Sequence, residues 1–244
     1  MSESEVLMNR TESIVHLREL VHQAKHAVFF GGAGVSTASG IPDFRGSGRG
    51  EEPVEYLLSR DCLRREPERF FAHYRRRMVY PDAAPNAAHR ALAALEAEGH
   101  LKAVITQNID GLHQKAGSRR VLELHGNGTR YYCDRCGARY PVLPVGDGVF
   151  RCDKTACRGL VRPDIVLYGE GLNAAVWEQA VAEVAAADLL LVGGSSLVVH
   201  PAASLLDYFA GEHLILINFQ PTPYDTKAET VLRESLTDVL PLLR

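Results

Sequence analysis

The sequence predicts an α/β fold: a doubly wound parallel sheet with a smaller domain inserted into it. Short, almost purely apolar segments alternate with segments of helical periodicity, a pattern typical of parallel strands covered on both faces. The first apolar segment runs directly into a glycine-rich turn. Two stretches of different composition, 41–85 and 127–164, interrupt the alternation, and they are the expected insertions.

The expected elements follow in chain order. Apolar residues recur at helical spacing from Ile14 to Ala24, with Thr11 and Ser13 as candidate N-caps, and a strand follows at 27–30. Helix and strand pairs are then expected at 86–98 and 102–106, 174–187 and 188–192, and 201–210 and 214–218, before a last helix at 228–243. This pattern assigns residues 1–40, 86–126 and 165–244 to the large domain, and 41–85 and 127–164 to the small one.

Composition and charge exclude several classes of protein. Hydrophobic residues make up 46% and charged residues 23%, as in ordinary globular chains. The net charge of -3 gives no general attraction to nucleic acid or to anionic membranes. An acidic N-terminus and the lack of a long apolar segment lead us to expect a cytoplasmic protein with no nucleic-acid or membrane partner.

Four cysteines form two pairs, Cys133-x2-Cys136 and Cys152-x4-Cys157, inside the second insertion. Thiolates at this spacing can complete the tetrahedral shell that zinc prefers, as in a zinc ribbon. Two disulfides are the alternative, but they are rare in a reducing compartment. Four protein ligands leave no position for water, so the sequence predicts one structural Zn²⁺. The fifth cysteine, Cys62, has no such context.

The turn at 31–46, GGAGVSTASGIPDFRG, has glycines that would let the backbone approach a pyrophosphate at a helix N-terminus. Thr37 replaces the third glycine of the usual dinucleotide fingerprint. No strand ends in an acidic residue about twenty positions later, where a ribose hydroxyl would be bound. An ordinary nicotinamide dehydrogenase is therefore disfavoured.

Polar residues gather after the second strand and before the cysteines. Gln107, Asn108 and Asp110 follow the strand at 102–106, where ligands bind in doubly wound folds. His125 lies beside a glycine at the expected domain junction and is the candidate general base. The histidines on predicted helices, His89 and His113, are expected to pack or cap.

Taken in order, these motifs resemble the sirtuin family of NAD-dependent protein lysine deacylases, and most of all its bacterial deacetylase branch. The matching segments are GAGVS at 32–36, GIPDFRG at 40–46, TQNID at 106–110, LHGN at 124–127, the four cysteines, VLYGE at 166–170, GSSL at 194–197 and IN at 217–218. The resemblance implies a Rossmann-like large domain, with the small domain made of a zinc ribbon and a helical module. Tyr168 and Ser195 depart from the family's usual Phe and Thr.

The resemblance also implies roles for single residues. The NAD diphosphate loop would comprise Gly32, Ala33, Gly34 and Ser36, and a segment closing over NAD would carry Asp43, Phe44 and Arg45. Nicotinamide and its ribose would be held by Gln107, Asn108 and Asp110, the last two acting in catalysis with the base His125. The adenosine half would meet Gly194, Ser195, Ser196, Asn218 and Asp238. The acyl-lysine peptide would meet Val166, Tyr168, Gly169, Glu170 and Val198.

The implied reaction transfers an acyl group, most often acetyl, from protein lysine to ADP-ribose, and NAD is consumed as co-substrate. Family members that remove succinyl or malonyl groups use a Tyr and an Arg three residues apart to pair with the acyl carboxylate. Tyr74 and Arg77 have this spacing, whereas a register at 72 and 75 places Ala72 at the tyrosine position. Desuccinylation or demalonylation, mono-ADP-ribosylation, and a non-catalytic NAD-binding module are the alternatives. Retention of Asn108, Asp110 and His125 argues against the last.

Overall fold

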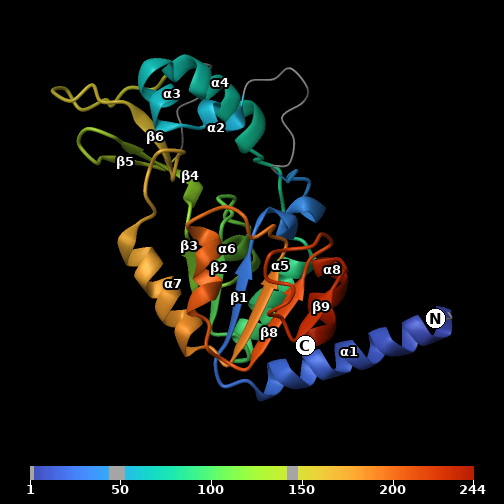
Figure 1. Ribbon diagram of the computed structural model, residues 1–244. Coiled ribbons are helices and arrows are strands. Elements are labelled where there is room, and N and C mark those ends of the chain that lie inside the picture. Colours follow the sequence, from blue (N-terminus) through green and yellow to red (C-terminus); the bar gives the residue numbers. More distant parts are fainter. Residues whose placement is uncertain (1–2, 44–52, 142–147) are drawn as a thin grey trace.

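The large sheet sits below the small one in the computed structural model, which describes residues 3–43, 53–141 and 148–244 (Figure 1). The large sheet is six-stranded and parallel, and the small one is three-stranded and antiparallel. Among these residues, no helix is both long and apolar enough to cross a membrane.

The large sheet has the order β3-β2-β1-β7-β8-β9. Its strands are β1 (Ala27–Gly31), β2 (Ala103–Thr106), β3 (Val121–Glu123), β7 (Leu189–Gly193), β8 (His213–Ile217) and β9 (Thr230–Leu232). The chain moves outward from β1 first toward β3 and later, from β7, toward β9. The strand order therefore reverses between β1 and β7, which is where ligands bind in open α/β sheets.

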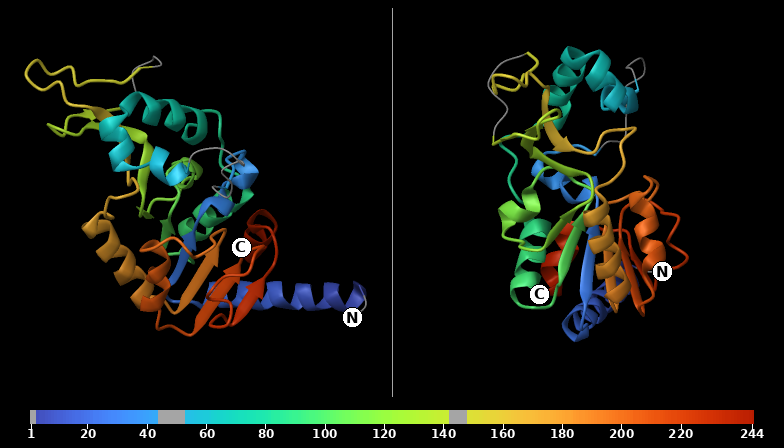
Figure 2. Two further views of the ribbon diagram at one scale, coloured as in Figure 1. Left: turned by 45° about the horizontal axis from the view of Figure 1, so that its top comes forward. Right: turned by 90° about the vertical axis from the view of Figure 1, so that its left-hand side faces the viewer.

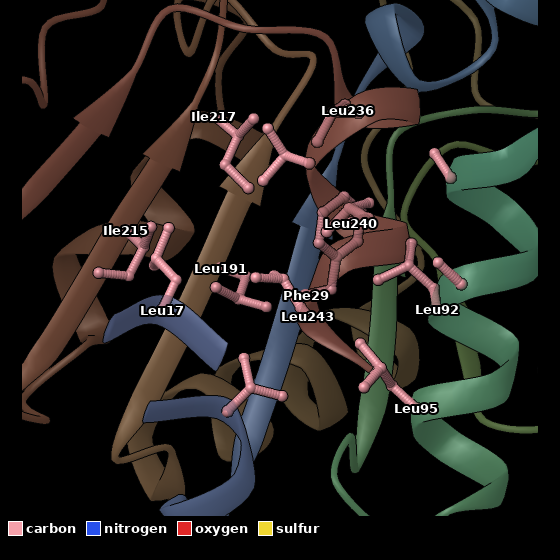
Figure 3. Packing of buried hydrophobic residues seen from close by; sticks show 14 of the residues in the cluster. Leu17, Phe29, Leu92, Leu95, Leu191, Ile215, Ile217, Leu236, Leu240 and Leu243 are labelled. Carbon is pink, nitrogen blue, oxygen red and sulfur yellow. The ribbon is translucent and has the colours of Figure 1, made fainter. Parts of the chain in front are cut away.

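Helices cover both faces of this sheet, as doubly wound folds require. Helices α1 (Glu3–Gln23), α5 (Ala87–Ala97) and α8 (Leu236–Val239) pack on one face, shown from close by in Figure 3. Helix α7 (Ala174–Ala186) and the 3-10 helix Ala202–Tyr208 pack on the other. Successive side chains of β1 alternate between the two cores: Phe29 lies in the first, and Val28 and Phe30 lie in the second. The predicted doubly wound parallel sheet is confirmed.

The small sheet has its own core. It consists of β4 (Gly126–Cys133), β5 (Arg139–Tyr140) and β6 (Val161–Ile165) in the order β5-β4-β6. Helices α2 (Val54–Leu57), α3 (Arg60–Arg65) and α4 (Pro67–Met78) share a buried cluster with it, in which Phe70 and Phe71 of α4 are fully buried. Helix α6 (Leu112–Ala116) lies after β2. Both views of Figure 2 show α2, α3 and α4 beside β4 and β6, beyond the carboxyl ends of the large sheet.

Two parts of the predicted secondary structure are wrong. The single helix expected at 228–243 is instead β9, then α8, then the 3-10 helix Leu240–Leu243, because β8 has an open edge that pairs with Thr230–Leu232. The first helix begins at Glu3 and passes through the expected caps Thr11 and Ser13, since no glycine or proline interrupts it. The helix expected at 201–210 is present, as a 3-10 helix over Ala202–Tyr208.

Candidate active site

The glycine-rich turn after β1 lies against the loop after β7, at the point where the strand order reverses. The Gly34 N–H donates to Gly194 O at 2.8 Å, and the Gly32 N–H donates to Gly193 O at 3.2 Å. A Cβ placed on Gly34 would lie 2.7 Å from the Gly194 Cα, and Gly194 itself has a φ of 62°. Only glycines allow the two loops to approach this closely.

The turn does not continue into an α-helix, contrary to the expectation from the dinucleotide fingerprint. It forms two short 3-10 helices, Ala33–Val35 and Thr37–Ser39, and ends at Gly40, which has a left-handed φ of 82°. The backbone therefore turns sharply after β1 and returns Ser36 toward the end of β2.

Ser36, Asn108 and Asp110 form a hydrogen-bonded network at this edge of the sheet. The Ser36 hydroxyl donates to Asp110 Oδ2 at 2.7 Å, and Asn108 Nδ2 donates to Ser36 Oγ at 3.1 Å. Asn108 Nδ2 also lies 3.1 Å from Gly32 O. Ser36 and Asn108 are buried, so this network ties the loop after β1 firmly to the loop after β2.

Two buried histidines lie beneath the network. His89 Nδ1 accepts the Asn86 N–H, which completes a capping box at the start of α5, and His89 Nε2 lies 3.4 Å from Ser36 Oγ. Burial lowers the pKa of His89 to about 4, although the charge of Asp110 opposes this. The sequence predicted that His89 packs or caps, but it did not predict the contact with Ser36. The Asn86-x-x-His89 spacing is typical of a capping box and could have placed the His89 ring at the start of the helix.

His113 packs on His89, with ring centroids 4.8 Å apart. The side chain is 1% exposed, and neither ring nitrogen has a hydrogen-bond partner among the described residues. Burial lowers the pKa of His113 to about 3. Both imidazoles are therefore neutral at physiological pH.

His125 lies immediately before β4, and its ring has a defined orientation. Nδ1 is 2.9 Å from Gln107 O, and since a carbonyl can only accept, Nδ1 carries the proton and Nε2 holds the lone pair. Burial lowers the pKa of His125, so the ring is neutral at physiological pH. The Gln107 side chain in turn donates to Ser195 Oγ at 3.0 Å. A neutral imidazole with one nitrogen already engaged is suited to general-base chemistry.

The segment after β6 borders the small sheet. Val166 N donates to His125 O at 2.9 Å, and Tyr168 pairs through its backbone with Leu58 and Arg60. The Tyr168 side chain is 49% exposed, and the Val198 side chain, on the loop after β7, is 60% exposed. Gly169 has a left-handed φ of 84°, where the segment turns.

Comparison with known proteins decides the family of this chain. The model of the Sir2 family matches residues 32–201. The chain belongs to the Sir2 family. The NAD-dependent protein deacetylase of Cutibacterium acnes is 48% identical over 233 residues, covering 92% of this chain and 94% of the relative. That of Clostridium acetobutylicum is 46% identical, covering 94% of this chain and 97% of the relative. The sequence-based resemblance to the sirtuins is thus confirmed.

Solved structures of the Sir2 family share this fold. A Sir2 homolog in complex with NAD aligns with a TM-score of 0.86 at 38% identity, covering 93% of this chain and 91% of that one. A complex of Sir2, a p53 peptide and NAD⁺ aligns with a TM-score of 0.82 at 38% identity, covering 98% and 96%.

The residues that the resemblance assigns to the adenosine half of NAD lie after β7, after β8 and on α8. Ser195 is buried and accepts from Leu197 N at 3.2 Å, with the half-buried Ser196 beside it. Asn218, at the end of β8, donates to Gln220 O at 2.7 Å. Asp238 is exposed in the first turn of α8, and its charge faces Arg10 of α1.

The segment after Gly40 is described only at its beginning. Asp43 is exposed at the end of the first described range. Phe44 and Arg45 lie outside the described residues. The expectation for these three residues stays a prediction.

The four cysteines of this Sir2-family chain come together at the end of β4 and in the loop before β6. Their Sγ atoms all lie within 4.8 Å of one another, with Cys133 and Cys157 at 3.5 Å and Cys136 and Cys152 at 3.7 Å. A tetrahedral Zn²⁺ with Zn–S bonds of about 2.3 Å separates its sulfurs by roughly 3.8 Å, so the spacing fits the ion. All five cysteines are free thiols, and the disulfide alternative is excluded.

One hydroxyl supports the cysteine cluster from outside. The Tyr140 hydroxyl lies 3.1 Å from Cys152 Sγ and 2.7 Å from Asp153 Oδ1, so its single proton is shared between these two acceptors. Such outer contacts orient ligand thiolates and tune a metal site.

Tyr74 does not offer its hydroxyl to an acyl group. The side chain is 1% exposed in the core of the small sheet, and its hydroxyl donates to Gly128 O at 3.0 Å. Arg77 lies on the exposed side of α4, as does Ala72. The alternative in which Tyr74 and Arg77 together bind an acyl carboxylate is therefore wrong, because the tyrosine is committed to packing.

Proposed function

We propose that this chain removes acetyl groups from lysine side chains of proteins, using NAD as co-substrate and releasing nicotinamide, free lysine and O-acetyl-ADP-ribose. The orientation of His125 carries the proposal, because a neutral imidazole with a defined lone pair is hydrogen-bonded to the loop after β2, at the carboxyl edge of the sheet. The deacetylase names of the bacterial relatives support the same reaction.

The polar groups at this edge fit NAD. NAD supplies an anomeric carbon that is open to attack when nicotinamide departs. In our proposal, Gly32, Ala33, Gly34 and Ser36 line its diphosphate, and the amides and carboxylate of Gln107, Asn108 and Asp110 hold the nicotinamide ribose and carboxamide. Gly194, Ser195, Ser196, Asn218 and Asp238 are assigned to the adenosine half. The glycine contact between the two loops supports this, since it brings backbone rather than side chains to the sheet edge.

Rigidity is what the Ser36 network contributes to the reaction. Three side chains joined by hydrogen bonds of 2.7 and 3.1 Å hold one arrangement before any substrate arrives. Groups that need no reorganisation during the reaction stabilise a transition state most effectively. We assign Asn108 and Asp110 to orienting the ribose and the leaving group.

His125 acts as the base in this proposal. Its Nε2 accepts a proton from a ribose hydroxyl, which frees that oxygen to attack the acyl carbon. The hydrogen bond from Nδ1 to Gln107 O stabilises the imidazolium that results. The lowered pKa of His125 keeps the unprotonated form dominant at neutral pH.

We assign the acyl-lysine peptide to the segment after β6, with Val166, Tyr168 and Gly169, and to the loop after β7, with Val198. The exposure of Tyr168 and Val198 supports this assignment. An extended peptide there would add as a strand between them. Structures of Sir2 bound to an acetylated peptide and to a propionylated peptide, both of which resemble this chain in fold, support an acylated peptide as the ligand.

The division into domains goes with this function. We propose residues 1–40, 86–126 and 165–244 as the NAD-binding domain, and 41–85 with 127–164 as the small domain that covers it. The separate core of the small sheet supports the division. The cytoplasmic location expected from the sequence stays a prediction.

The test incubates the purified chain with NAD and an acetyl-lysine peptide, and in parallel with the succinyl and malonyl peptides. Mass spectrometry is expected to show equal amounts of nicotinamide and deacetylated peptide, with much less product from the acidic acyl groups. His125→Ala should lower turnover by about 10²–10⁴-fold, the usual contribution of a general base. His16→Ala, an exposed histidine on α1, is the matched control and should keep full turnover. Nicotinamide release that does not depend on peptide would refute the proposal.

A further inference from the structure

An ion pair between a buried arginine and a partly buried glutamate lies just behind the segment assigned to the peptide. Arg162 of β6 is 5% exposed, and its guanidinium donates to both carboxylate oxygens of Glu170, at 2.5 and 2.9 Å. It also donates to Ile165 O at 2.8 Å and lies over the Tyr132 ring, 5.6 Å from the centroid. A planar guanidinium held at this many points fixes both the distance and the angle of its partner.

Glu170 uses the same carboxylate to close a turn. Its Oε2 accepts the Leu167 N–H at 3.0 Å, while the Glu170 N–H donates to Leu167 O at 2.9 Å. Burial acts to raise the pKa of Glu170, but the hydrogen bonds from Arg162 and Leu167 outweigh it, and the pKa lies below its ordinary value. The carboxylate is thus charged at neutral pH and engaged within the protein, an orientation that no local sequence pattern indicated.

The turn that Glu170 closes is the segment at 166–169. This segment is held at one end by the Val166 hydrogen bond to His125 O. In its middle, Tyr168 bonds through its backbone to Leu58 and Arg60. The ion pair holds the other end, where Gly169 and Gly171 leave the backbone little stiffness of its own.

We propose that Arg162 and Glu170 are positioning residues that hold the backbone at 166–169 in register for the acyl-lysine peptide, and that Glu170 acts through Arg162 without touching the peptide. The inference rests on the proposed deacetylase function and revises the role first assigned to Glu170, which was contact with the peptide. A strand-like recognition site needs its backbone groups fixed closely, because hydrogen bonds to an added strand weaken steeply when donor and acceptor are displaced.

Glu170→Gln tests this with little change in shape. The amide oxygen can still accept from Leu167, but the charged fork to Arg162 is lost. We expect the KM for an acetyl-lysine peptide to rise about tenfold, while kcat at saturating peptide and the KM for NAD stay within about twofold. Glu98→Gln, which breaks the exposed pair with Arg244, is the matched control and should leave all three unchanged.

A double variant, Arg162→Met with Glu170→Leu, separates positioning from general stability. Replacing both members of a buried pair by apolar residues generally preserves folding, whereas removing one leaves an unpaired charge. If the pair positions the segment, the double variant folds with a near-wild-type Tm but keeps the raised peptide KM. It also gives the answer if Glu170→Gln alone fails to fold.

The outcomes separate this inference from the proposed function. Wild-type protein that releases no nicotinamide with NAD and acetyl-lysine peptide would refute the deacetylase function. Wild-type protein that turns over normally, beside a folded Glu170→Gln or double variant with a wild-type peptide KM, would overturn the inference alone. Binding of a fluorescent acetyl-lysine peptide, measured by anisotropy, is expected to weaken in step with the KM.

Discussion

Replacing His113 by Phe should remove a dependence of folding stability on pH that the buried imidazole creates. In the folded protein the pKa of His113 is lowered to about 3, because the ring is 1% exposed and neither nitrogen has a partner among the described residues. In the unfolded chain the same ring titrates near pH 6.5. Between these values the unfolded state binds a proton that the folded state refuses.

The sign and size of the effect follow by linkage. Since the unfolded state binds more protons, stability falls as pH drops below about 6.5, by roughly 1.4 kcal/mol per pH unit for one histidine. From pH 7 to pH 5 this amounts to about 2 kcal/mol, a sizeable share of the 5–15 kcal/mol typical of a folded domain. His113→Phe removes this pH-dependent contribution to stability. His89 titrates in both proteins, so its own contribution largely cancels when the two are compared.

The assay is urea unfolding at pH 7 and at pH 5, followed by the fluorescence of Trp177, the single tryptophan. Trp177 packs edge-on against Tyr208 with 6.2 Å between ring centroids, so unfolding changes its surroundings. The difference between the unfolding free energies of His113→Phe and of the wild type is measured at each pH. Between pH 7 and pH 5 it should change by about 2 kcal/mol, so that the variant gains stability relative to the wild type.

The control is Ile105→Val, at a fully buried position in β2. It removes a methyl group and no titratable one, so its cost of about 0.5–1.5 kcal/mol should be equal at the two pH values. If the gap between His113→Phe and wild type also stays the same at both pH values, the buried ring is not excluding protons and the reasoning is refuted.

Three further substitutions test other parts of the structure. Gly34→Ala should lower the free energy of unfolding by about 1–3 kcal/mol and weaken NAD binding measured by calorimetry, because the new Cβ would lie 2.7 Å from the Gly194 Cα. An undiminished NAD affinity would contradict the close approach of the two loops. Tyr140→Phe removes the donor to Cys152 and should speed zinc transfer to a coloured chelator by about tenfold or more, so an unchanged release rate would argue against support of the thiolate. Tyr74→Phe should cost about 1 kcal/mol in urea unfolding and leave the ratio of acetyl to succinyl turnover unchanged; a shift in that ratio would restore the residue to acyl recognition.

The sequence predicted the parts of the fold that depend on long, strongly patterned segments. The strands around β1 and the helices α5 and α7 are near their expected places, because their apolar residues are buried on both faces or along one stripe. The cysteine spacing was equally informative, since four thiols that lie together in space also lie in two pairs along the chain.

Short edge elements and long-range pairs were beyond such reasoning. The strands β3 and β9 have only three residues each, and their pairing comes from the open edges of β2 and β8 and not from their own pattern. Glu170 appeared as a cleft residue because its partner Arg162 has no special place in a local pattern. The sequence likewise placed Ser36, Asn108 and Asp110 near one edge but did not reveal that they bond to one another.

The separation of the large sheet's two cores from the core of the small sheet has a consequence for how such a protein can diversify. Both insertions leave the large sheet at the carboxyl ends of its strands, one after β1 and one after β3. Among the described residues, neither core cluster of the large sheet includes any side chain from 41–85 or 127–164. Substitutions in these stretches therefore alter what lies over the ligand edge without repacking the sheet below. A lineage can therefore vary the domain that lies over the sheet while the sheet and its two cores are inherited intact.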